Sequence, residues 1–127
     1  SGAIYLGTKN FVKVRDKKLP KGDCFPMAEV AGVNGAKQCS NTLPMCHPLP
    51  LDQVLVWFEL DNDRQSVLVF CEVASYSKTG VEMEALTAVS TAALTIYDMC
   101  KSLDKEITIT DIKLKHKSGG KSGVFNA

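Results

Sequence analysis

Two pairs of charged residues flank an uncharged run and are the side chains of this sequence best suited to acid–base chemistry. Glu82 and Glu84 precede thirteen uncharged residues, 85–97, and Asp98 and Lys101 follow them. A run of small and apolar residues predicts a packed helix, so part of this charge is expected to be buried. Because buried charge is costly unless it is paired, these residues indicate proton transfer rather than packing alone.

Asp98 and Lys101 are three residues apart and therefore share one face of the predicted helix. The simpler interpretation is a solvated ion pair at the C-terminal end of the helix, where the helix dipole also stabilises a lysine. However, Tyr97, Met99 and Cys100 surround the pair with bulky or apolar surface. A partly buried acid–lysine pair can shift into the range of proton transfer at neutral pH.

Glu82 and Glu84 are two residues apart, so on a helix they point to different sides. Either one alone could simply stabilise the start of the helix. The sixteen residues from Glu82 to Asp98 span about 24 Å of continuous helix at 1.5 Å per residue. A single small-molecule site within one chain could hardly use both ends. If both belong to one site, that site lies between two subunits.

A basic stripe near the end of the sequence is suited to phosphate. Its members are Lys113, Lys115, His116, Lys117 and Lys121, and glycines 119 and 120 interrupt it. The string is not a P-loop, because lysine occupies position 115, where that motif requires glycine, and no helix is predicted to follow. The alternative is a disordered basic tail.

Lys21 and His47 are two further candidate site residues, and neither is distinctive by residue type alone. Lys21 lies in a polar turn and by itself is an ordinary surface lysine. His47 lies among three prolines in residues 44–50, which impose a rigid extended path and fix its direction. A lone histidine is more often structural than catalytic.

The composition is that of a globular domain. The 127 residues are enough for one domain, and 45% hydrophobic with 23% charged content is ordinary for a soluble protein. A net charge of +1 argues against a general nucleic-acid binder, and no apolar run suggests a membrane span or a signal peptide. Five dispersed cysteines without a C-x-x-C pair favour a reducing cytoplasm or organelle interior, and no residue spacing predicts a metal site.

The pattern of elements predicts the order β-α-β-β-α-β. Strands are expected at residues 5–14, 54–60, 66–75 and 107–115, the last with its alternation broken at Asp111. Helices are expected from Asp23, an N-cap, to residues 40–41, and over residues 81–102. In the first helix the predicted buried stripe comprises Met27, Val30, Ala31 and Val33.

This order is typical of a ferredoxin-like α+β fold, an antiparallel sheet with its helices on one face. Residues 1–127 form one domain in this interpretation, and the ends, 1–10 and 118–127, are expected to be flexible. The second face of the sheet is then either solvated or an interface.

Several strings of this sequence together resemble the MoaC family. They occur in the family's order between residues 19 and 123: KGD (21–23), AK (36–37), LPMCHPL (43–49), KTGVEMEALT (78–87), LTIYDMCK (94–101) and KSGGKSG (117–123). One departure is Gln38, which stands where family members often carry arginine or another polar residue, so a phosphate contact is not carried over to that position.

The resemblance implies a ferredoxin-like lyase, a cyclic pyranopterin monophosphate synthase of molybdenum cofactor biosynthesis. Its substrate is a cyclised dihydro-GTP, which is rearranged to a pterin with a cyclic phosphate and loss of pyrophosphate. The resemblance also implies a hexamer, built as a trimer of dimers with sites at subunit interfaces. No cofactor is implied beyond magnesium accompanying the triphosphate, and neither nucleic acid nor membrane is an expected partner.

Residue by residue, the resemblance implies that Asp98 is the main acid–base residue and Lys101 its partner. Lys21 and Lys117 are implied as further catalytic or phosphate-binding lysines. The implied substrate-contacting residues are Met45, Cys46, His47, Glu82, Met83, Glu84 and Lys121. Two competing hypotheses are an inactive ferredoxin-like scaffold that binds a nucleotide and a nucleic-acid role for the basic tail.

Overall fold

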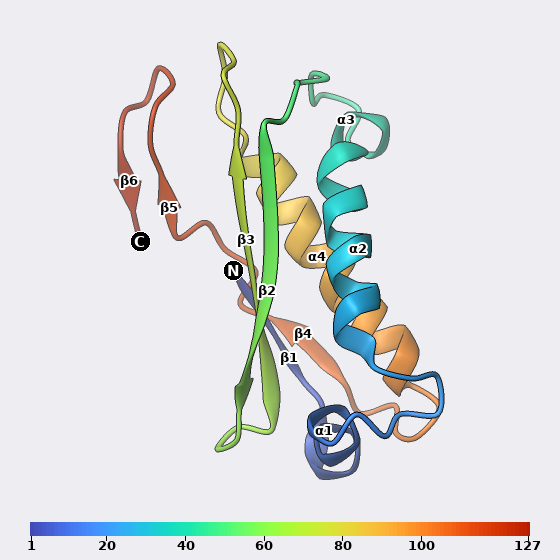
Figure 1. Ribbon diagram of the computed structural model, residues 1–127. Helices are drawn as coiled ribbons and strands as arrows, with labels where there is room; N and C mark the ends of the chain where they lie inside the picture. The colour runs from blue at the N-terminus through green and yellow to red at the C-terminus, as the bar shows by residue number, and fades with distance from the viewer.

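A four-stranded antiparallel sheet covered on one face by two long helices forms the body of the protein. The computed structural model describes residues 1–127. The strands lie in the order β2 (Gln53–Asp61), β3 (Ser66–Ala74), β1 (Gly2–Tyr5) and β4 (Thr108–Thr110). Helices α2 (Cys24–Lys37) and α4 (Glu82–Cys100) pack side by side on the same face (Figure 1). The predicted ferredoxin-like α+β fold is confirmed.

Four shorter elements complete the fold. Helix α1 (Gly7–Arg15) follows the first strand, and α3 (Cys39–Thr42) follows α2. Strands β5 (His116–Lys117) and β6 (Phe125–Asn126) pair only with each other. This small hairpin lies across the sheet from α2 (Figure 1). Lys117, which the alternative interpretation placed in a disordered basic tail, therefore lies in a paired strand.

The first strand was wrongly predicted at residues 5–14. The observed strand ends at Tyr5, because the chain turns at Gly7 with a positive φ of 71° and continues as α1. Asn10, Phe11 and Val14 are buried at helical spacing. The side-chain amide nitrogen of the buried Asn10 also donates a hydrogen bond of 3.3 Å to the carbonyl oxygen of Asp104, which supplies one of the partners that a buried polar side chain needs.

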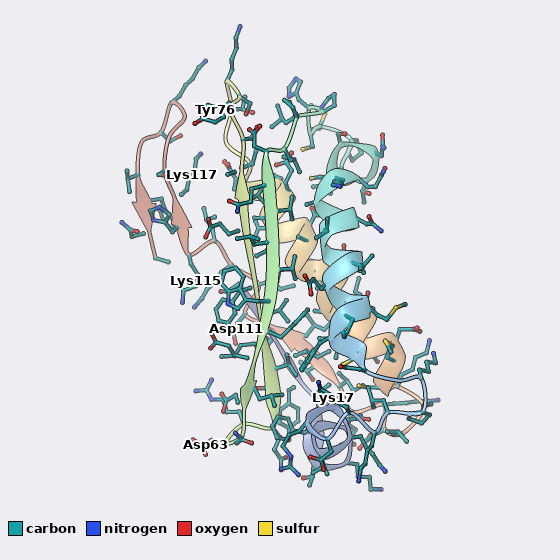
Figure 2. The ribbon with its side chains drawn as sticks, in the orientation of Figure 1. Lys17, Asp63, Tyr76, Asp111, Lys115 and Lys117 are labelled. Carbon is teal, nitrogen blue, oxygen red and sulfur yellow. The ribbon has the colours of Figure 1, made fainter.

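The last strand is also shorter than predicted. It ends at Thr110, and Asp111 takes a left-handed conformation with φ 55°. The break at Asp111 is therefore the end of the strand rather than a bulge within it. Beyond that point the chain leaves the sheet and reaches β5 on the side opposite α2 (Figures 1 and 2).

The N-cap of α2 is confirmed, since the Asp23 carboxylate accepts a hydrogen bond of 3.2 Å from the amide of Phe25. The predicted buried stripe is wrong at Met27 and Val30, which are 59% and 61% exposed, whereas Ala31 and Val33 are half-buried and Val33 packs against the core. The buried residues are instead small and recur every four positions: Cys24, Ala28, Gly32 and Ala36. Close approach of α4 leaves no room for larger side chains on that face.

Gly35 illustrates how tightly the two helices pack. A Cβ atom at this position would lie 2.9 Å from Thr91 Cβ and 3.3 Å from the Thr87 carbonyl oxygen. The Thr91 hydroxyl donates to that same carbonyl at 2.8 Å, so the side chain cannot turn away without losing a hydrogen bond. The uncharged run of α4 is thus packed closely against α2 within one chain, as its small residues predicted.

We expect Gly35→Ala to lower the free energy of unfolding by about 1 kcal/mol, because overpacking outweighs the gain in helix propensity. Urea denaturation followed by circular dichroism measures the change. Asn34→Ala is the matched control, since Asn34 is exposed on the same helix and should be neutral or slightly stabilising. Equal stabilisation by both variants would contradict the close packing of α2 on α4.

The helix predicted to run from Asp23 to residues 40–41 ends earlier, at Lys37, and α3 follows it as a separate turn. The other element predictions agree with the structure. The β2–β3 hairpin pairs in register from Gln53 with Ala74 to Asp61 with Ser66. Helix α4 begins and ends within two residues of its predicted bounds. None of the helices combines the length and apolar character that a membrane span requires.

Flexibility of the two chain ends stays a prediction, although the packing of residues 1–10 counts against it. Strand β1 lies between β3 and β4, and Ile4 and Leu6 are fully buried. The face of the sheet turned away from α2 and α4 carries large apolar side chains. Among them, Tyr5, Leu55 and Trp57 are 41–46% exposed.

Candidate functional site

Helix α4 separates two groups of charged side chains. At its C-terminal end, Asp98 lies with Lys101 and Lys21, here called the Asp98 cluster. At its N-terminal end, Glu82 pairs with Lys117, here called the Glu82 cluster. The predicted continuous helix between Glu82 and Asp98 is confirmed, so the two groups lie at opposite ends of α4.

In the Asp98 cluster, two lysines hold one carboxylate. Lys101 Nζ lies 2.8 Å from Asp98 Oδ1, and Lys21 Nζ lies 3.5 Å from Oδ2 and 3.3 Å from the Asp98 carbonyl oxygen. Lys21 comes from the turn before α2, which buried Leu19 anchors and Gly22 bends with φ 95°. The structure thus joins residues that are 77 positions apart.

The electrostatics of this cluster differ from the expectation for a partly buried pair. The Asp98 side chain is 57% exposed and that of Lys101 53% exposed. The hydrogen bond from Lys101 lowers the pKa of Asp98, with smaller contributions from the nearby lysine charges. The same bond raises the pKa of Lys101. In a single chain Asp98 is therefore an ionised base, Lys101 is a charged donor, and neither titrates near pH 7.

The Glu82 cluster is less exposed. Lys117 Nζ lies 2.9 Å from Glu82 Oε1, and the two side chains are 17% and 31% exposed. The hydrogen bond from Lys117 lowers the pKa of Glu82. Glu82 Oε2 is buried without a hydrogen-bond partner, so this carboxylate can still accept a donor. A Cβ at position 80 would collide with Glu82 Oε2 and lie 2.9 Å from Lys117 Cε, so a larger residue there would displace these two side chains.

The lowered pKa of Glu82 gives a pH-dependent stability. Its stabilisation is fully present above the ordinary carboxyl pKa of 4.5 and is lost as the pH falls through the lower pKa of the folded state. We expect Glu82→Gln to cost about 1 kcal/mol of unfolding free energy at pH 7 and almost nothing at pH 3. Urea unfolding at both pH values measures this. Glu29→Gln, at an exposed position without an ion pair, should show no such difference, and a pH-independent cost for Glu82→Gln would contradict the argument.

A cavity of about 990 Å³ lies on the side of the sheet away from α2, between the sheet and the segment that leads through β5. Its floor includes Trp57 and Phe70, whose rings stack with centroids 5.4 Å apart. Lysines 78, 113, 115 and 117 and glutamates 72 and 82 line it, so cations are in excess. Figure 2 shows Lys115 and Lys117 on this side of the sheet.

The sequence reasoning missed three of these cavity residues, Lys78, Trp57 and Phe70. A signal for the aromatic pair existed, because both residues occupy outward positions of neighbouring hairpin strands, and in the observed register they are direct partners. Lys78 had no comparable signal. It belongs to the matched string KTGVEMEALT, yet nothing in its spacing points to a cavity.

The other implied substrate-contacting residues lie outside this cavity. Cys46 Sγ lies 3.6 Å from Glu84 Oε1, and Glu84 is only 3% exposed. Glu82 and Glu84 point to different sides of the helix, as expected from their spacing. The residues exposed to solvent are Met45, His47, Met83 and Lys121. In a single chain the structure therefore gathers the implied site residues into separate groups, with α4 between the Asp98 and Glu82 clusters.

The fold and these groups define a class: a ferredoxin-like α+β protein with carboxylate–lysine clusters suited to proton transfer on an anionic small molecule. A family model described as the MoaC family matches residues 1–120. The chain belongs to the MoaC family.

Similar proteins carry one common name, cyclic pyranopterin monophosphate synthase. The protein of Syntrophomonas wolfei is 56% identical over 111 residues, which are 87% of this chain and 71% of the relative. That of Heliobacterium modesticaldum is 49% identical over 98% of this chain and 78% of its own length. The Salinibacter ruber protein is 47% identical over 97% of this chain and 72% of its own length.

Proposed function

We propose that this protein is a cyclic pyranopterin monophosphate synthase, a lyase of molybdenum cofactor biosynthesis. It converts 3',8-cyclo-7,8-dihydroguanosine triphosphate to cyclic pyranopterin monophosphate and pyrophosphate. The observation that carries the proposal is the Asp98 cluster, an ionised carboxylate between two lysines in a chain of this family. Relatives at 47–56% identity bear the name of this activity.

Asp98 and its lysines supply the proton transfers. Opening the cyclised purine and closing the pterin ring both need a base and an acid close to the reacting atoms. Asp98, held ionised by Lys101, accepts a proton, and Lys101 or Lys21 donates one. A second chain that covers this exposed cluster would disfavour the charged forms of both Asp98 and Lys101. The pKa of Asp98 would then rise and that of Lys101 would fall.

The lysines at the other end of α4 bind the phosphates. Lys117 supplies a partly buried cation beside a cavity rich in lysine, and Lys121 follows in the exposed turn before β6. Such cations stabilise the charge that develops as pyrophosphate leaves. Magnesium accompanying the triphosphate would add to this stabilisation. The reaction needs no redox centre.

The residues near the N-terminal end of α4 complete substrate binding. Cys46 and Glu84 lie together where the segment 43–50 meets α4. Met45, His47 and Met83 project into solvent in the single chain, where a substrate or a second chain can reach them. These five residues and Glu82 are proposed to hold the pterin and ribose portions.

A homo-oligomer, a hexamer arranged as a trimer of dimers, supplies complete sites. About 24 Å of α4 separates Glu82 from Asp98, so one substrate can contact both clusters only if they come from different chains. A trimer of dimers needs two different contacts between chains. The chain has two apolar faces for this purpose, one on the open sheet with Leu55 and Trp57, the other on α2 and α4 with Val30 and Leu94.

The test is direct assay of the purified protein with the cyclised dihydro-GTP. We expect release of pyrophosphate together with a fluorescent pterin after oxidation of the product. Nucleotide binding in calorimetry without any product would instead identify an inactive nucleotide-binding scaffold. A species of monomer mass in light scattering at micromolar concentration would contradict the shared site.

A further inference from the structure

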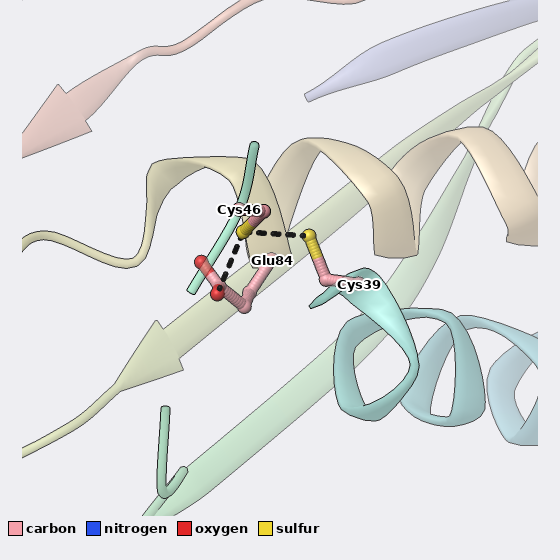
Figure 3. Close-up of side chains that lie close together, drawn as sticks. All are labelled: Cys39, Cys46 and Glu84. Carbon is pink, nitrogen blue, oxygen red and sulfur yellow. Dashed lines mark hydrogen bonds between the residues drawn. The ribbon is translucent and has the colours of Figure 1, made fainter. Parts of the chain in front are cut away.

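Two thiols and one carboxylate converge beside the start of α4. Cys39 Sγ lies 3.6 Å from Cys46 Sγ, which lies 3.6 Å from Glu84 Oε1, and the three groups are all within 4.8 Å of one another (Figure 3). They come from α3, from the proline-rich segment that follows it, and from α4. Sequence spacing did not reveal this group, because Glu84 is 38 residues beyond Cys46.

The carboxylate of this group lacks a cation. Glu84 is 3% exposed and forms no salt bridge, whereas Glu82 two residues earlier pairs with Lys117. Its only side-chain partner is the Cys46 thiol. The N-terminal end of α4 favours a negative charge there, but only as a partial charge. Cys39 is 1% exposed, with Thr87 Oγ1 at 3.4 Å as a further neighbour, so the thiol is held in place.

Two of the three distances match those of ligands around zinc, and the third, from Cys39 Sγ to the Glu84 carboxylate, is within 4.8 Å. Tetrahedral zinc with bonds of about 2.3 Å to sulfur and about 2.0 Å to oxygen places two sulfurs about 3.8 Å apart and sulfur and oxygen about 3.5 Å apart. The two observed separations of 3.6 Å are each within about 0.2 Å of these values. Thiolate sulfur selects zinc over magnesium or calcium.

We propose that Cys39, Cys46 and Glu84 form a zinc-binding site with its fourth position open to water. Zinc replaces the protons of both thiols, which pass to solvent, and supplies the cation that the buried carboxylate lacks. Binding ties the segment 43–50 to α4. The effect on activity rests on the function proposed above: zinc competes with substrate for Cys46 and Glu84 and therefore inhibits turnover. Cys39 binds the metal but not the substrate.

The experiment titrates zinc and cobalt(II) into the intact protein, reduced with a phosphine and free of substrate. We expect one zinc per chain by equilibrium dialysis, and with cobalt the near-ultraviolet charge-transfer absorption of thiolate ligands. Cys39→Ser should weaken zinc binding at least about tenfold and reduce that absorption, since a thiolate ligand is lost. Cys71→Ala, at a thiol outside the group, should bind zinc like the unaltered protein.

Cys46→Ser, in the segment 43–50 and not in the helix core, provides a second variant should Cys39→Ser fail to fold; it too should lose the cobalt signal. Undiminished zinc affinity in either folded variant, or no stoichiometric zinc in the unaltered protein, would overturn the site. Metal binding is measured without substrate, so its failure is separate from failure of the proposed activity. With an active enzyme, zinc should inhibit the unaltered protein at lower concentrations than Cys39→Ser, and equal inhibition would overturn the competition.

Discussion

Asp98→Asn is expected to lower kcat/KM by roughly 10²- to 10⁴-fold, the usual contribution of a positioned general base. The amide keeps the shape of the side chain but cannot accept the proton that an ionised carboxylate accepts. Because Asp98 is more than half exposed in the single chain, its replacement should leave the fold intact. Pyrophosphate release from the cyclised dihydro-GTP, together with an unchanged circular dichroism spectrum, measures the effect.

The matched control for this prediction is Asp63→Asn. Asp63 is exposed in the β2–β3 turn, away from α4, and takes part in no salt bridge (Figure 2). It should retain full turnover. Normal turnover by both Asp98→Asn and Lys101→Ala would remove the catalytic roles assigned to this cluster.

Mixed oligomers of two inactive variants should recover activity if each site takes its two clusters from different chains. Asp98→Asn disables one cluster, and Lys117→Ala disables the other by removing the cation beside Glu82. When the two variants assemble at random in equal amounts, about one quarter of the sites contain two intact clusters, so about one quarter of the normal activity is expected. Co-expression with two affinity tags yields the mixed species, and the pyrophosphate assay measures it.

The control for complementation pairs variants of the same cluster. A mixture of Asp98→Asn and Lys101→Ala should recover nothing, because every Asp98 cluster then carries one defect. Native mass spectrometry establishes that mixing has occurred. Mixed oligomers of Asp98→Asn with Lys117→Ala that remain inactive would show that one chain supplies both clusters, and full activity of Lys117→Ala on its own would show that the Glu82 cluster is not used.

Features governed by local sequence were predictable. The cap at Asp23, the apolar hairpin from Gln53 to Ala74 and the long helix α4 follow from residue type and periodicity over short stretches. Rise per residue alone placed Glu82 and Asp98 far apart. The ferredoxin-like order could therefore be predicted from the sequence, as could the separation of the two charged groups.

Errors arose where neighbouring elements decide the outcome. The strand predicted at residues 5–14 rested on a weak pattern, whereas Gly7 turns the chain and burial of Phe11 and Val14 favours a helix. In α2 the large residues Met27 and Val30 were predicted to form the buried face. The buried face instead carries small residues, because α4 packs closely against it. Periodicity locates an apolar stripe, but it does not report how near the next helix lies.

The sequence by itself determined the two long helices, the β2–β3 hairpin and which residues could do chemistry. Only the tertiary structure decided their partners: Lys21 with Asp98, 77 positions apart, Lys117 with Glu82, 35 apart, and Cys39 and Cys46 with Glu84. The physical reason is that pairing and pKa depend on distances of a few ångströms and on burial. Those distances are set by packing between elements remote in the chain, which no local pattern encodes.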